Sequence, residues 1–342
     1  MNKRVMAQKA IPIIWLTVSA LLGGGISYLV LDHTAESAPE QRQRTADAAK
    51  PAAICPYTTA WVRGYQHIRP LLSSEPICES ARFEGLRTAI GAIVDGLKAS
   101  GQVTSTSVYV RDFKNAEWTW YNGDEPYDPG SMLKVPLLLT YLAMAEEDPA
   151  LLERTWTCER VDFEAPQHTA FPAPQVELNK SYTLRQIFEY MMVHSDNRAT
   201  VMLLRRVPKG RYLSTFTDLG LPTPDWDAPT YRLNVRDYSV FIKALYNSSL
   251  LSPVNSEYAL ELMTRATFKQ GLVAGLPAEV EVAHKFGEAG TPQERQLHET
   301  GLVYAEGNPY LITVMTRGER LDSLAGAIAS ISQLVYRHMR PA

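Results

Sequence analysis

The 342-residue sequence has few cysteines, few histidines and no excess of basic residues. Three cysteines and seven scattered histidines, without a Cys-x-x-Cys or His-Glu-x-x-His motif, give no support to a metal site. The net charge of −3 comes from interspersed acidic and basic residues, so no basic face predicts binding to nucleic acid. The sequence therefore predicts a protein that needs no metal or other cofactor and has no nucleic-acid partner. Nothing in the sequence indicates an oligomeric state.

One hydrophobic run is unusually long. Residues 10–31 contain no charged side chain, and as a helix they could cross the roughly 30 Å core of a bilayer. Lys3, Arg4 and Lys9 precede the run, so the positive-inside rule places residues 1–9 in the cytoplasm and the rest of the chain in the periplasm or outside the cell. Because the apolar part of a signal peptide usually spans only about 7 to 15 residues, we favour an uncleaved anchor over a cleaved signal.

The residues after this run suggest a linker and then one folded domain. Residues 32–54 have few large apolar side chains and no period, which is typical of a flexible linker. The domain is expected to cover residues 55–342. Since an exported chain lies in an oxidising compartment, Cys55 and Cys78 are a candidate disulfide, with Cys158 left as a buried thiol.

Hydrophobic periodicity places helices and strands at both ends of the domain. It predicts an amphipathic helix over 83–97, followed by a β-hairpin with strands at 106–112 and 118–121. The other predicted elements are helices at 184–192, 199–206, 210–219, 235–247 and 255–266, strands at 284–286, 297–305 and 310–316, and a last helix at 321–339. Strands near both ends therefore enclose a mainly helical middle.

A turn-forming stretch from Asp128 to Gly130 leads into a predicted helix that opens on Ser131. Residues three apart lie on one helical face, so Lys134 can come within hydrogen-bond reach of Ser131 and accept the proton of an attacking serine. Backbone N–H groups at the helix start would stabilise an oxyanion that forms beside this serine. The alternative is a serine that caps the helix and a lysine that pairs with Asn197 or a carboxylate.

Two further motifs follow in the chain, Ser195-Asp196-Asn197 and Lys285-Phe286-Gly287. A serine with a lysine three residues later, then Ser-Asp-Asn, then Lys-x-Gly is the signature of the serine β-lactamases and penicillin-binding proteins. The sequence resembles this superfamily over about residues 80–340, and within it the class A β-lactamase-like branch. The stretches around the motifs, 183–192 and 301–304, extend the resemblance.

The resemblance implies an α/β (α+β) fold, in which an antiparallel sheet is flanked by terminal helices and carries an inserted all-helical lobe over about residues 129–255. It also implies a role for each motif residue. Ser131 would be the nucleophile and Lys134 its proton acceptor. Ser195 would relay a proton to the leaving group, Asp196 would brace its loop, and Asn197 would bind Lys134 and the substrate amide. Lys285 would attract the donor's carboxylate, Gly287 would let substrate lie against the strand, and the backbone N–H of Glu288 would complete the oxyanion hole with that of Ser131.

The sequence departs from the class A pattern at the loop that carries the deacylating base. Class A β-lactamases hydrolyse their acyl-enzyme with a glutamate in an Arg-x-Glu-x-x-Leu-Asn loop, whereas residues 219–236 form a shorter stretch without glutamate. Asp225 or Asp227 could substitute, although a solvated turn aspartate is the simpler interpretation. Without a base directed at water, the acyl-enzyme should last.

The second departure is Phe286, where the family usually has a threonine or serine that binds the donor's carboxylate. Either another donor such as Arg295 takes the carboxylate, or the substrate is not the usual D-alanyl peptide. The leading hypothesis is an exported, membrane-anchored serine hydrolase or acyltransferase that acts on cell-wall peptides or β-lactam-like small molecules. A true class A β-lactamase is the second hypothesis, and a non-catalytic binding module of the same fold is the third.

Overall fold

The computed structural model describes residues 55–62, 71–165, 170–228 and 230–340. The predicted membrane anchor at 10–31 and the linker at 32–54 lie outside these residues, so both stay predictions. Among the described residues, no helix combines the length and hydropathy that a membrane crossing requires.

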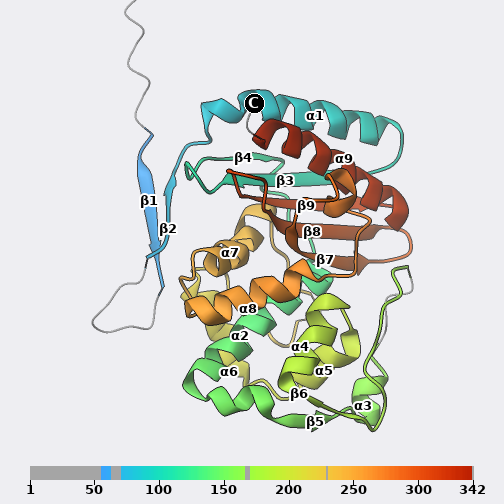
Figure 1. Cartoon of the computed structure of the whole chain (residues 1–342). Coiled ribbons are helices and arrows are strands. Elements are labelled where there is room, and N and C mark those ends of the chain that lie inside the picture. Colours follow the sequence, from blue (N-terminus) through green and yellow to red (C-terminus); the bar gives the residue numbers. More distant parts are fainter. Residues whose placement is uncertain (1–54, 63–70, 166–169, 229, 341–342) are drawn as a thin grey trace, which may run out of the picture. The chain divides into compact units, whose positions relative to one another are not determined.

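A five-stranded antiparallel sheet, in the order β4-β3-β9-β8-β7, joins the two ends of the domain (Figure 1). Its strands are β3 (Ser105–Asp112), β4 (Trp118–Tyr121), β7 (Val282–Gly290), β8 (Arg295–Val303) and β9 (Tyr310–Gly318). β3 from the N-terminal half pairs with β9 along its whole length, from Ser105 opposite Arg317 to Asp112 opposite Tyr310. β7, which carries Lys285, lies at one edge of the sheet, where one side of the strand remains available to other elements.

Two terminal helices, α1 (Glu84–Ala99) and α9 (Leu321–Met339), lie side by side along one face of the sheet (Figure 1). In α1 the buried residues Leu86, Ile90, Val94 and Leu97 recur at intervals of three or four, so one stripe of the helix packs into the core. This arrangement confirms the predicted antiparallel sheet flanked by terminal helices.

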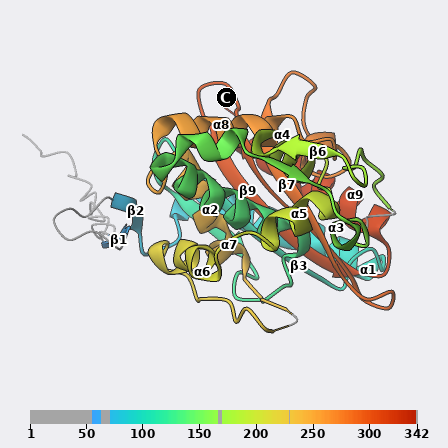
Figure 2. The same ribbon diagram turned by 90° about the horizontal axis from the view of Figure 1, so that it is seen from below.

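The opposite face of the sheet packs against a lobe of helices, which Figure 2 shows from below. The lobe contains α2 (Lys134–Glu147), α3 (Arg160–Phe163), α4 (Leu184–Val193), α5 (Asn197–Leu204), α6 (Lys209–Asp218), α7 (Val235–Tyr246) and α8 (Pro253–Thr264), with the 3₁₀ helices η2 (Gly130–Leu133) and η3 (Pro149–Glu153). It is not purely helical, because β5 (Thr155–Thr157) and β6 (Ser181–Thr183) pair within it. Every residue of α2 from Lys134 to Leu142 is buried, so this helix is the centre of the lobe.

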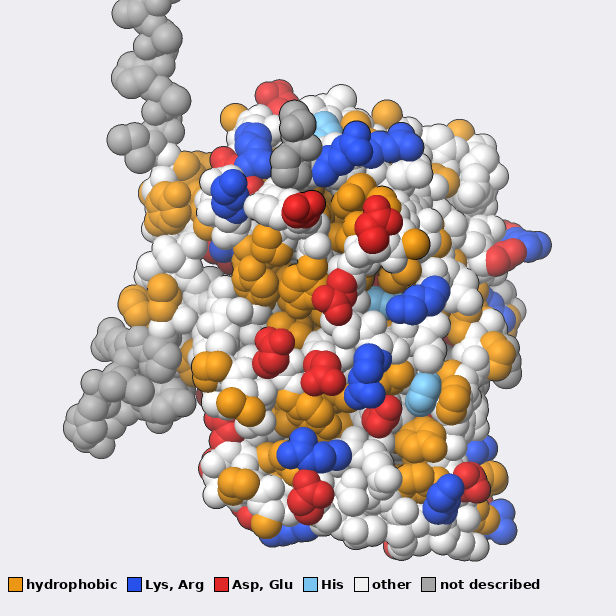
Figure 3. Space-filling model, in the orientation of Figure 1, with side chains coloured by type: hydrophobic (Ala, Val, Ile, Leu, Met, Phe, Trp, Pro, Cys, Tyr) orange, Lys and Arg blue, Asp and Glu red, His pale blue; other side chains and the backbone are white. Residues whose placement is uncertain are grey.

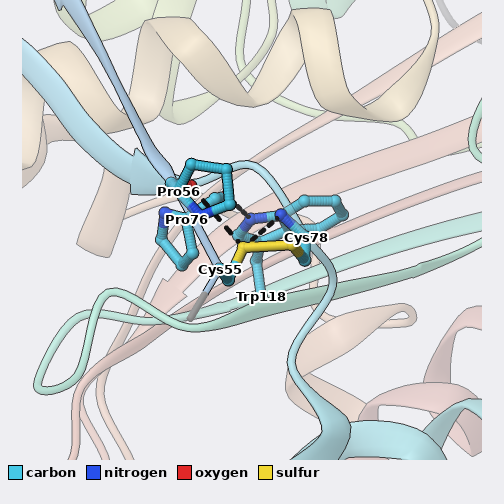
Figure 4. Close-up of a disulfide and its surroundings, with 5 residues drawn as sticks. All are labelled: Cys55, Pro56, Pro76, Cys78 and Trp118. Carbon is cyan, nitrogen blue, oxygen red and sulfur yellow. Dashed lines mark hydrogen bonds between the residues drawn. A yellow bond between two sulfur atoms is a disulfide. The ribbon is translucent and has the colours of Figure 1, made fainter. Parts of the chain in front are cut away.

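The domain begins with a hairpin that the sequence patterns did not predict. Its strands, β1 (Tyr57–Trp61) and β2 (Leu71–Pro76), pair antiparallel, and a disulfide joins Cys55 to Cys78 next to their ends (Figure 4). The indole N–H of Trp118 donates to the carbonyl of Pro76 at 2.8 Å, which fastens this end of the hairpin to the main sheet. Cys158 is a buried free thiol.

A buried charge cluster also holds β2. The Glu75 carboxylate lies 2.9 Å from the Arg111 guanidinium and 2.8 Å from the Lys243 ammonium, and all three side chains are buried. Burial by itself would raise the pKa of Glu75, but the two cations outweigh burial and lower it. On the surface, acidic and basic side chains are interspersed over the face drawn in Figure 3, as the sequence predicted.

Candidate active site

The three sequence motifs meet at the hydroxyl of Ser195. The Lys134 ammonium group lies 3.1 Å from this hydroxyl, and that of Lys285 lies 2.7 Å from it. Lys134 Nζ also contacts the backbone carbonyl of Ser195 at 2.5 Å and Asn197 Oδ1 at 2.7 Å. Residues from α2, from the start of α5 and from β7 therefore converge on one point, as the resemblance implied.

Ser131 lies in the 3₁₀ helix η2 and not in the first turn of an α-helix, which corrects the expectation that the helix opens on it. The backbone N–H of Lys134 bonds to the Ser131 carbonyl, and residues three apart in a 3₁₀ helix lie almost directly above one another. Pro136 explains the local geometry, because it has no N–H to bond the Met132 carbonyl as an α-helix would require. Instead, the phenol of Tyr238 donates to that carbonyl at 2.7 Å.

A histidine that the sequence patterns did not single out holds the start of this turn. His298 on β8 accepts the Thr316 N–H at Nδ1, so its Nε2 is the donor to the Asp128 carbonyl at 3.0 Å. Burial lowers the pKa of His298 to about 3, which keeps the ring neutral. The Asp128 carboxylate in turn accepts the N–H of Gly130 at 3.0 Å. The turn that carries Ser131 is thus bonded to the sheet behind it.

Two glycines let this turn and β7 pack backbone against backbone. Gly130 has φ +52°, and a Cβ there would lie 2.2 Å from the Glu288 carbonyl oxygen. A Cβ on Gly287 would lie 2.2 Å from the Pro129 carbonyl oxygen. The first atoms that a side chain at position 287 would meet therefore belong to the turn that carries Ser131. The expected role of Gly287 in making room for substrate stays a prediction.

Ser195 and Asp196 form a bend before α5. Ser195 has φ +56°, a backbone conformation that is costly for a residue with a side chain and is often found at functional sites. The Asp196 carboxylate accepts N–H groups from Arg198 at 2.9 Å and Val176 at 2.8 Å. Asp196 thus caps α5 and binds the loop of Val176, the bracing position expected for it.

The two lysines have different electrostatic environments. Burial, together with the nearby charge of Lys285, lowers the pKa of Lys134 well below its usual value. Burial also lowers the pKa of Lys285, to about 7, against the opposing attraction of the Glu299 carboxylate. Glu299 is itself buried and lies 2.6 Å from His284 Nδ1. The lowered pKa favours the neutral form of Lys134, which is the form that can act as a base, whereas Lys285 is partly charged near neutral pH.

Phe286 belongs to an aromatic cluster. Its ring stacks on that of Phe268 with centroids 4.3 Å apart and meets Phe171 edge-on at 5.7 Å, and Lys285 Nζ lies 4.4 Å from its centroid. The residue that takes the place of the family's hydroxyl is therefore a buried ring in an aromatic cluster. Arg295, the alternative donor, lies 3.6 Å from the Glu288 carboxylate on the strand that carries the motif.

A cavity of about 350 Å³ opens beside Ser131. Its described wall comprises Gly130, Ser131, Leu133, Lys134, Leu137, Asn197, Thr200, Leu204, Tyr212 and Glu288. Among these described residues the single carboxylate is that of Glu288. Asp225 and Asp227 are exposed and form a turn in which the Asp225 carboxylate accepts the Asp227 N–H at 3.1 Å, so neither lines the cavity as a substitute base.

Comparisons with known proteins agree with this geometry. Residues 85–339 match the sequence profile of the "Beta-lactamase enzyme family". No curated protein sequence matches the chain. Among solved structures, PBP-A is similar at 21% identity with a TM-score of 0.63, covering 74% of this chain and 95% of that one. The TLA-1 extended spectrum β-lactamase is similar at 18% identity with a TM-score of 0.64, covering 75% of this chain and 99% of that one. A β-lactamase from Chitinophaga pinensis DSM 2588 is similar at 19% identity with a TM-score of 0.64, covering 74% of this chain and 99% of that one. At these identities the structural likeness shows the fold.

Proposed function

Because the chain belongs to the beta-lactamase enzyme family, we propose that it is a serine hydrolase or acyltransferase that forms an acyl-enzyme on Ser131. The observation that carries the proposal is the Ser195 hydroxyl, which lies between the amino groups of Lys134 at 3.1 Å and Lys285 at 2.7 Å. Such an arrangement of buried lysines is costly to fold, and it serves proton transfer better than it serves stability.

Acylation would proceed through these groups in order. Neutral Lys134 accepts the hydroxyl proton of Ser131 while Ser131 Oγ forms a bond to the acyl carbonyl carbon. The backbone N–H groups of Ser131 and Glu288 stabilise the oxyanion. The proton then passes from Lys134 through the Ser195 hydroxyl to the leaving nitrogen as its bond to the carbonyl carbon breaks. Charged Lys285 attracts the carboxylate of the donor, and Asn197 holds the amide of the acyl group.

The acyl-enzyme would be slow to hydrolyse. A water attacking the ester needs a base, and residues 219–236, which correspond to the class A loop, contain no glutamate. The single carboxylate in the described wall of the cavity, that of Glu288, lies on β7 and 3.6 Å from the Arg295 guanidinium. We therefore favour a penicillin-binding acyltransferase or slow hydrolase acting on cell-wall peptides or β-lactams over a true β-lactamase. PBP-A, one of the similar structures, has been solved in a mutant form as an acyl-enzyme with penicillin-G, which makes benzylpenicillin a suitable probe.

We also propose that the domain is exported and stays attached to the membrane through residues 10–31. The disulfide between Cys55 and Cys78 supports an oxidising compartment. Protease added to spheroplasts should digest the domain while a cytoplasmic marker survives. Protection of the domain under these conditions would contradict export.

The test of the chemistry is the intact mass of the protein, followed over time after mixing with benzylpenicillin. We expect one lasting adduct in the wild type and none in Ser131→Ala. Ser330→Ala, on the exposed side of α9, is the matched control and should be labelled like the wild type. Rapid consumption of penicillin without an adduct would favour the β-lactamase, and neither adduct nor consumption would favour the binding module.

A further inference from the structure

The cavity beside Ser131 extends well past the catalytic groups. Asn197, Thr200 and Leu204 line it from α5, and residues at these intervals lie on one face of a helix. At a rise of about 1.5 Å per residue, the lined face of α5 runs for roughly 10 Å from Asn197 to Leu204. α2 contributes in the same way, with Leu137 one turn after Lys134.

The part of the cavity away from the lysines is apolar. Leu137 and Tyr212 are almost fully buried, whereas Leu204 is 36% exposed and lies where the cavity meets solvent. Thr200 donates its hydroxyl proton to the Asp196 carbonyl at 2.8 Å, so that proton is used within α5. The Tyr212 ring is held edge-on by Phe216 and Trp226, at centroid distances of 5.2 and 5.7 Å.

We propose that this region, which we call the acyl pocket (Leu133, Leu137, Thr200, Leu204 and Tyr212), binds the substituent of the acyl group and selects donors in which that substituent is uncharged and apolar. The inference rests on the proposed function and narrows its substrate class. The whole cavity, including the part beside Ser131 and Lys134, has a volume of about 350 Å³, near the lower end of the roughly 300–1,000 Å³ of small-molecule sites. The acyl pocket is only a part of it, so we expect it to take a single ring-sized group.

Charge supports the same selection. A charged substituent would lose its water against leucine side chains, and none of the five residues of the acyl pocket offers it an opposite charge. An anionic one would in addition approach the Glu288 carboxylate, and a cationic one would compete with Arg295, which already lies 3.6 Å from that carboxylate. Both kinds of donor should therefore acylate Ser131 more slowly than a neutral one.

The acyl pocket also bears on deacylation. An ordered water needs about two to four polar partners. Leu133, Leu137 and Leu204 offer none, and the only side-chain polar atoms among the five residues of the acyl pocket are the hydroxyls of Thr200 and Tyr212. Once an apolar substituent fills the pocket, little space remains for a water near the ester. A donor that fits the pocket should thus give both the fastest acylation and the longest-lived adduct.

The experiment compares penicillins that differ only in the acyl group, with acylation rates read from intact mass. Benzylpenicillin, ampicillin and carbenicillin share a phenyl ring and carry hydrogen, an amine or a carboxylate on the carbon next to it, and the bare penicillin nucleus lacks the acyl group. We expect benzylpenicillin to react fastest, about tenfold or more faster than carbenicillin. The acylation rate with benzylpenicillin, divided by the rate with the bare nucleus, should fall by about tenfold in Leu204→Glu. The same ratio should be unchanged in Leu204→Met. Val254→Glu, at an exposed site on α8, is the control.

A second measurement separates the pocket from the chemistry. Fluorine NMR of para-fluorophenylacetamide reports binding of a neutral ring without any covalent step. Binding to the wild type but not to Leu204→Glu, with no adduct from any penicillin, would support the pocket and overturn the proposed acyl-enzyme. Adducts that form at rates independent of the acyl group and of Leu204→Glu would overturn the pocket alone. Neither binding nor adducts would overturn both.

Discussion

Gly287→Ala is the substitution that tests most directly how the site is built. The added Cβ would lie 2.2 Å from the Pro129 carbonyl oxygen and 2.9 Å from the Met132 backbone nitrogen. Both neighbours are backbone atoms of the turn that carries Ser131, so neither can rotate away. Real Cβ atoms essentially never approach closer than 3.0 Å, so β7 and the turn must separate by about 0.8 Å.

The separation should cost activity more than stability. Overpacking of this kind costs about 1–3 kcal/mol, which for a domain of this size lowers Tm by very roughly 2–4 °C per kcal/mol. A displacement approaching 1 Å between the nucleophile and the oxyanion donors can cost about a hundredfold in rate. We therefore expect Gly287→Ala to fold, with a Tm lower by several degrees and benzylpenicillin acylation slower by about two orders of magnitude.

The matched control is the same substitution at Gly326, an exposed position inside α9 where a Cβ meets nothing within 4 Å. Gly326→Ala should leave acylation unchanged and raise stability by about 0.5–1 kcal/mol, because alanine loses less backbone entropy in a helix. Intact-mass kinetics and thermal unfolding measure both variants. If Gly287→Ala is acylated at the wild-type rate with an unchanged Tm, the close packing of turn and strand does not position Ser131, and the reasoning is refuted.

Three further predictions concern the buried ionisable groups. The ammonium form of Lys285 predominates only below its pKa of about 7, so KM for carboxylate-bearing donors should rise as the pH rises through 7. Lys285→Arg should flatten this pH dependence, because arginine stays charged. A pH-independent KM in the wild type would argue against the proposed role of Lys285 in attracting the donor's carboxylate. Lys134→Ala should slow acylation by about a hundredfold to ten-thousandfold, and acylation that survives this change unaltered would show that another group is the base. His298→Leu removes the donor to the Asp128 carbonyl and should lower the free energy of unfolding, measured with urea, by about 1–3 kcal/mol. Because the His298 ring is neutral above its pKa of about 3, the acylation rate of the wild type should show no titration of this residue between pH 5 and 8.

Local patterns were sufficient for much of the domain. The apolar stripe of α1 and the all-round burial of α2 follow from the spacing of apolar residues, and the predicted helices of the lobe agree with α4 to α8 to within a few residues. The three motifs, through the family resemblance, predicted that their segments would form one site and that Asn197 would contact Lys134, as the structure shows. These features depend on neighbouring residues or on a short motif, so the sequence by itself determined them.

Only the tertiary structure decided what surrounds and holds those motifs. Glu75 meets Lys243, and His298 meets Asp128, across about 170 residues of chain, and neither pair leaves a local pattern in the sequence. The reason for glycine at position 287 became visible only when β7 came to lie against the turn of Pro129. The cavity beside Ser131 likewise exists because helices from separate parts of the lobe fail to fill one space. Such features depend on which distant surfaces meet, and that is set by packing of the whole core.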